Sequence, residues 1–73
     1  MGVIMIPRYD THKYTVNVPP TREQGSYRTV AGASYMQTVQ QCALQDYNTA
    51  RAHDGLPPVS RMPAGTTYTR LPS

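Results

Sequence analysis

The chain has 73 residues and a formal net charge of +3, with 7 Pro, 5 Gly and neither Phe nor Trp. Ordering so short a chain costs about 1.5 kcal/mol per residue, which would need about 4,400 Å² of apolar burial at about 25 cal/mol per Å². Val, Ile, Leu and Met supply only 15 side chains, so we expect no independent globular core. Because Cys42 is the only cysteine, an intrachain disulfide is excluded, and a protein partner is the expected source of stability.

Membrane and secretion signals are missing from the sequence pattern. The longest purely apolar run, Val3–Ile6, is far shorter than the roughly 18 residues of a membrane span. The start of the sequence also lacks the basic region of a signal peptide. We therefore expect no membrane span and assembly in the cytoplasm of a host cell.

Residues 1–30 are predicted to form an extended N-terminal arm with one or two short strands. Val3–Ile6 is apolar and stops at Pro7, while Tyr14–Val18 alternates bulky and small polar side chains before a Pro-Pro pair. After a turn-prone stretch, Tyr27–Val30 is a further candidate strand.

Residues 31–55 are predicted to contain one amphipathic helix, from Tyr35 to Asp54. Ser34 and Gln37 have the spacing of a capping box, and Gly55 is placed to end the helix in a left-handed conformation. At 100° per residue, one broad apolar stripe collects Tyr35, Met36, Val39, Cys42, Ala43, Tyr47 and Ala50. Asp46 falls inside this stripe and would need a hydrogen-bonding partner there.

The other face of this helix is rich in uncharged amides. Uncharged amides are less costly to bury in a contact than ions, provided that their hydrogen bonds are met. Two interpretations stay open: a helix surrounded by a partner, and a Gln-rich face in water.

Residues 56–73 contain four of the seven prolines and are predicted to form an extended C-terminal tail that binds another subunit. The expected fold is therefore mostly irregular and extended, with one central amphipathic α-helix and one or two short β-strands in the arm, and not an independent globular core.

Arginine and tyrosine recur side by side along the chain. This pair is enriched at protein interfaces, because each side chain combines large contact area with directional hydrogen bonds. The same pair can stack on bases and neutralise phosphates, although basic charge in nucleic-acid-binding tails is usually clustered and here it is spread. The residues predicted to bind a partner are Tyr14, Val16, Val18, Tyr27, Arg28, Tyr35, Met36, Val39, Ala43, Tyr47, Tyr68 and Arg70.

Catalytic, cofactor and metal sites are not predicted. His12 near Asp10 comes without a nucleophile or an oxyanion site, and the glycines form no phosphate-binding loop. The two histidines do not complete a zinc spacing with Cys42, and the acidic residues are too scattered for a calcium or magnesium loop.

The resulting hypothesis is a non-enzymatic structural accessory subunit that straps or cements a large protein assembly, in many copies per particle. Its arm, with Tyr14, Val16 and Val18 on one face, would add to the sheet edge of a neighbour, while the helix fills a groove. By analogy with small extended chains of viral shells, the expected location is a bacteriophage virion: capsid, portal or tail. The alternatives are a nucleic-acid-binding peptide inside a particle and an accessory subunit of a respiratory or cytoskeletal complex.

Overall fold

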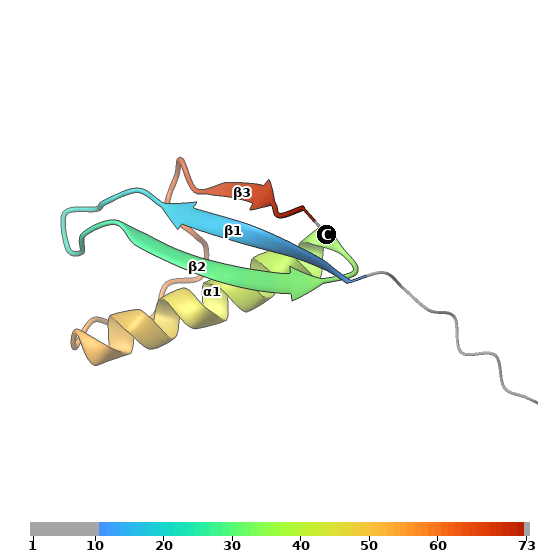
Figure 1. Ribbon diagram of the computed structural model, residues 1–73. Coiled ribbons are helices and arrows are strands. Elements are labelled where there is room, and N and C mark those ends of the chain that lie inside the picture. The colour runs from blue at the N-terminus through green and yellow to red at the C-terminus, as the bar shows by residue number, and fades with distance from the viewer. Residues whose placement is uncertain (1–10, 73) are drawn as a thin grey trace, which may run out of the picture.

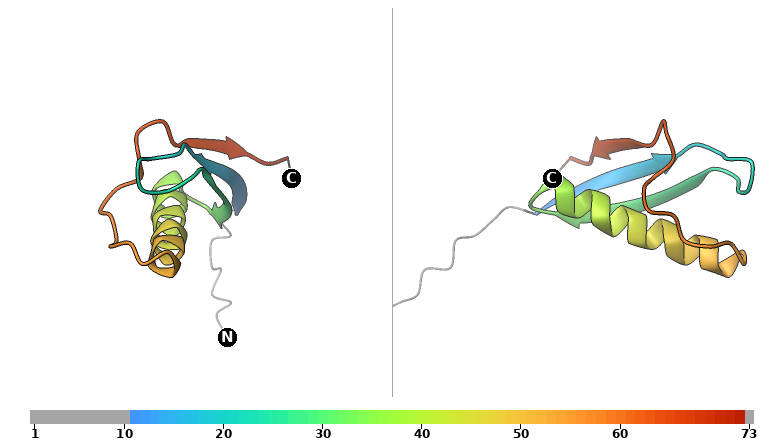
Figure 2. Two further views of the ribbon diagram at one scale, coloured as in Figure 1. Left: turned by 90° about the vertical axis from the view of Figure 1, so that its left-hand side faces the viewer. Right: turned by 180° about the vertical axis from the view of Figure 1, so that it is seen from behind.

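The computed structural model describes residues 11–72 and arranges them as a three-stranded sheet with one helix on one face (Figure 1). The elements in chain order are β1 (His12–Val18), β2 (Tyr27–Ala33), α1 (Met36–His53) and β3 (Thr67–Arg70). The sheet order is β2-β1-β3, and both pairs are antiparallel. Seen from behind, α1 crosses in front of the sheet, and the linker to β3 returns over the helix side (Figure 2).

The central strand β1 alternates in the way that a strand with one buried face requires. Val16 and Val18 are buried under the helix, whereas Asn17 between them is exposed. The register places Thr29 of β2 and Tyr68 of β3 on either side of Val16. These three side chains therefore point to the same side of the sheet, because directly paired residues share a face.

The helix α1 ends as its sequence predicts but begins differently. Gly55 has φ of 73°, and its N–H and that of Leu56 donate to the carbonyls of Ala52 and Arg51, at 3.1 and 2.9 Å. This is the Schellman arrangement, which a glycine in the left-handed conformation permits. At the start, the N-cap residue is Tyr35 in an extended conformation with no side-chain cap bond, so the predicted Ser34 capping box is wrong.

The core lies between α1 and the helix-facing side of the sheet. Tyr47, the largest fully buried side chain, meets the ring of Tyr27 edge-on at a centroid distance of 5.6 Å. The buried apolar residues are Val16, Val18, Ala31, Val39, Ala43 and Tyr47, and the half-buried ones packed against them include Tyr14, Cys42, Val59, Met62 and Tyr68.

Residues 56–66 are fastened to α1 before the chain reaches β3. The Asn48 side chain makes a two-way bond with Val59, donating to its carbonyl at 3.0 Å and accepting from its N–H at 2.9 Å. Arg51, only 3% exposed, donates from Nε to the carbonyl of Pro57 at 2.7 Å. This linker is thus held on the helix, and a second left-handed glycine, Gly65, turns it into β3.

The predicted fold class is therefore wrong. The chain forms a small three-stranded antiparallel sheet packed on a helix, and the segment expected to be an extended tail supplies β3. The expected burial of apolar area was too small because the N-terminal arm and the C-terminal tail were treated as separate segments. Separate segments have no surface within the chain against which to bury their side chains. Pairing Val16 with Tyr68, far apart in sequence, creates that surface, and local composition carries no information on such a pairing.

The predicted bounds of the individual strands and of the helix differ from the observed bounds by up to three residues. The strand predicted at Tyr14–Val18 extends back to His12, and the one at Tyr27–Val30 extends forward to Ala33. The helix predicted from Tyr35 to Asp54 occupies Met36–His53. The predicted strand at Val3–Ile6 lies outside the described residues.

Candidate interaction surfaces

The residues predicted to bind a partner separate into three groups by burial. Val16, Val18, Val39, Ala43 and Tyr47 form the core of the chain itself. Half-buried against that core are Tyr14, Tyr27 and Tyr68, and burial raises the pKa of the Tyr68 phenol. Solvent-exposed positions are held by Arg28, Tyr35, Met36 and Arg70. Only this last group presents a surface to another molecule without unfolding the sheet.

Asp46, expected to need a partner within the apolar stripe, finds one on β2. Its carboxylate accepts a hydrogen bond from the Thr29 hydroxyl at 3.2 Å, and its carbonyl accepts one from the Tyr27 hydroxyl at 3.5 Å. Asp46 is exposed, so its charge stays hydrated. It therefore ties the helix to β2 and is used within the chain.

The outer edge of β2 is the first candidate surface. The Leu71 N–H donates to the Lys13 carbonyl at 2.8 Å, so the main chain of Lys13 points to β3. Main-chain groups alternate in direction along an antiparallel strand, so Tyr14 and Val16 point to β2. Their partners there, Ala31 and Thr29, point back to β1. The positions between and beside these, Arg28, Val30 and Gly32, consequently direct their main-chain N–H and C=O groups away from the sheet.

Exposed apolar side chains gather at this same edge and at the turn that follows it. Val30 is 53% exposed, Tyr35 58% and Met36 39%, and these are the large exposed hydrophobic residues among positions 11–72. An unpaired strand with apolar neighbours is a template for the strand of another chain. β2 contains no proline, and Arg28 is its one charged residue, so little in this strand opposes pairing with another chain.

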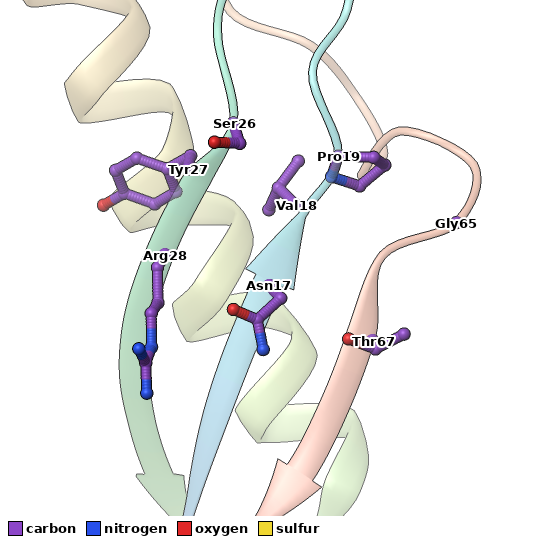
Figure 3. Close-up of a pocket in the computed structure, with 8 residues that line it drawn as sticks. All are labelled: Asn17, Val18, Pro19, Ser26, Tyr27, Arg28, Gly65 and Thr67. Atoms are coloured by element: carbon purple, nitrogen blue, oxygen red, sulfur yellow. The ribbon is translucent and has the colours of Figure 1, made fainter.

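The second candidate surface is the face of the sheet opposite α1, which we call the open face. Its side chains come from alternate positions of the three strands: Lys13, Thr15, Asn17, Arg28, Val30, Gly32, Thr67 and Thr69. At one end of this face is a hollow of about 410 Å³, and the residues that line it include Asn17, Arg28 and Thr67 (Figure 3). The sequence predicted only Arg28 of this set, although the alternation of Lys13, Thr15 and Asn17 with apolar neighbours marks a polar face.

Residues 11–72 contain neither a cluster of metal ligands nor a membrane-spanning helix. Between Thr11 and Pro72, His, Cys, Asp and Glu form no group of three or more that could hold a metal ion. The one helix in that range, α1, lacks the apolar character needed to cross a bilayer. Comparisons with protein-family models, with curated proteins and with solved structures found no match.

Proposed function

We propose that the chain is a non-enzymatic structural accessory subunit that attaches to a larger protein assembly through the outer edge of β2. The supporting observation is that Val30, Tyr35 and Met36, the large exposed apolar residues among positions 11–72, all lie on β2 or directly after it. An extended segment of a partner would pair with the main chain of β2 and cover these side chains. Backbone pairing supplies affinity, and apolar contacts beside Val30 supply specificity.

In this proposal the chain receives a strand instead of donating one. The sequence-based hypothesis made residues 14–18 the donor, but β1 is paired on both sides within its own sheet. The edge strands are β2 and the four-residue β3. The longer edge, with seven residues, offers more backbone pairs and more apolar area.

The assembly that we propose is a virion, with the chain as a cement or minor capsid, portal or tail component in many copies. The basis for this part is analogy: the chain is short and lysine-poor, like the small chains that cement subunits in viral shells. An accessory role in a respiratory or cytoskeletal complex uses the same edge. Isolating the high-mass particle that contains the chain would identify which assembly it joins.

The test compares two tagged variants expressed in the native cell. Val30→Lys adds a long charged side chain at the centre of the β2 edge, which opposes strand pairing. Gln41→Lys adds the same charge at an exposed position of α1 and serves as the matched control. We expect Val30→Lys to be lost from the high-mass fraction on size-exclusion chromatography while Gln41→Lys remains, with both variants folded by circular dichroism. Equal incorporation of the two variants would rule out the β2 edge as the attachment site.

A further inference from the structure

The acidic residues among positions 11–72 all lie away from the open face of the sheet. Among residues 11–72 the acidic residues are Glu23, Asp46 and Asp54, and each has a partner: Arg51, Thr29 and Gln24, respectively. Two of these acids belong to α1 or its C-cap, and Glu23 reaches the helix residue Arg51. The described part of the open face carries no carboxylate to offset its cations, Lys13 and Arg28.

Most side chains of the open face, all except Val30 and Gly32, can donate hydrogen bonds. The register places Arg28, Asn17 and Thr67 in one row across the three strands, so that a guanidinium, an amide and a hydroxyl stand next to one another (Figure 3). The next row has Val30, Thr15 and Thr69. These rows supply donors for an anion along the width of the sheet.

The two cations stand at opposite ends of this face. Lys13 is four residues before Asn17, the direct partner of Arg28, and at about 3.3 Å per residue the two rows are about 13 Å apart. An extended polyanion with regularly spaced charges can contact both cations. Between them Thr15 is only 6% exposed, so its side chain does not obstruct a chain that lies along β1.

We propose that the open face binds the phosphodiester backbone of nucleic acid. Lys13 and Arg28 contact phosphates, and the exposed side chains of Asn17, Thr67 and Thr69 donate to phosphate oxygens. The tyrosines of the sheet, Tyr14, Tyr27 and Tyr68, share the helix-facing side. Stacking on bases is therefore not part of the binding, and the contact is independent of nucleotide sequence. This inference does not rest on attachment through the β2 edge, because it uses side chains of the open face and no edge pairing.

The affinity should be modest and should depend on salt. Neutralising about two phosphates of a single strand gives a log–log salt slope of about −1.4, which is a loss of about sevenfold in affinity between about 50 and 200 mM salt. Removing one cation should reduce this slope to about −0.7, a loss of about threefold over the same range.

The experiment measures fluorescence anisotropy of a labelled single-stranded thymidine oligonucleotide titrated with the full chain, Arg28→Gln and Arg61→Gln. Arg61, exposed in the linker beside Gln37 and Gln40 of α1, is the matched control for loss of one positive charge away from the open face. We expect Arg28→Gln to lower the affinity and halve the salt slope and Arg61→Gln to leave both near the original values. Equal losses in the two variants would overturn the proposal, because they would show a response to net charge alone.

Amide chemical shifts and a second polyanion complete the test. Titration with the same oligonucleotide should shift Lys13, Asn17 and Arg28 and leave the exposed face of α1 unchanged; shifts confined to α1 would contradict the assignment. Poly-glutamate of matched length should bind more weakly. Its carboxylates are spaced differently from phosphates, so they do not accept hydrogen bonds from the same open-face donors. Equal or tighter binding of poly-glutamate would replace nucleic acid with an acidic protein segment and overturn the proposal.

Discussion

Replacing Arg51 with Ala is expected to destabilise the fold more than any loss of an ion pair can explain. Arg51 is 3% exposed, its Nε donates to the Pro57 carbonyl at 2.7 Å, and its guanidinium carbon lies 6.0 Å from the centre of the Tyr47 ring. Its ion pair with Glu23 is long, at 3.5 Å, and the Glu23 side chain is 54% exposed. The hydrogen bond and the buried methylenes should therefore dominate over the charge pair.

The magnitude follows from these contacts. A hydrogen bond from a charged donor contributes about 1.5–3 kcal/mol, and the two buried methylenes that alanine lacks, Cγ and Cδ, contribute about 0.8 kcal/mol each. Removing the buried charge returns part of this by ending its desolvation, so Arg51→Ala should lower the free energy of unfolding by about 2–4 kcal/mol. A single core of this size supplies about 3–5 kcal/mol, which places the variant near the midpoint of unfolding at room temperature.

Two further variants separate the contributions. Arg51→Met keeps most of the buried volume but removes the bond to Pro57, so its loss should be smaller than that of Arg51→Ala. Glu23→Gln removes only the exposed ion pair and should cost less than about 1 kcal/mol. Urea unfolding followed by circular dichroism at the helix band gives all three values. A Glu23→Gln loss as large as that of Arg51→Ala would refute the reasoning, and so would an Arg51→Met variant as stable as the original chain.

Three other perturbations test the fold. Val16→Asp places a charge at a fully buried position of the central strand and should abolish the cooperative thermal transition, whereas a transition like that of the original chain would contradict the core described above. Gly55→Ala meets no atom within 4 Å but stands at φ of 73°, so strain alone should cost about 1 kcal/mol and lower the melting temperature by about 4–8 °C; an unchanged melting temperature would argue against the left-handed C-terminus. Burial raises the pKa of Tyr68 from 10.0, so the folded state holds its phenolic proton more tightly than the unfolded state does. The urea midpoint should therefore be independent of this group below pH 10 and should fall as the pH rises from there through the folded-state pKa. Tyr68→Phe should remove that part of the decline.

Local elements were predictable because their signals are short in range. The alternation around Val16 marks a strand, and the spacing of Val39, Ala43 and Tyr47 marks a helical face, each within a few residues. Gly55 likewise indicated the end of the helix, because glycine readily adopts the left-handed conformation found there. The start of the helix was misjudged because Ser34 offers a cap by type and spacing, while the chain leaving β2 enters the helix through Tyr35 instead.

The candidate surfaces depended on pairings that the sequence does not display. Arg28 was identified from its neighbour Tyr27, yet their side chains lie on opposite faces of the sheet, and its partner across the sheet is Asn17 of β1. Val30 gained its significance only when β2 proved to be an edge strand. Arg51 is a similar case: a helical arginine is usually solvated, and only the return of the chain at Pro57 buries it.

The sequence by itself determined where the chain is extended, where it is helical and where the helix stops, because steric and periodic preferences of adjacent residues decide these features. Only the tertiary structure decided that β3 joins β1 and that Tyr14, Tyr27 and Tyr68 share the helix side. It also decided that Lys13 and Arg28 share the open face, with no acidic side chain on that face among residues 11–72. These outcomes depend on contacts between residues distant in sequence, such as Val16 and Tyr68. Their free energy comes from burial and register, which exist only once the strands are assembled.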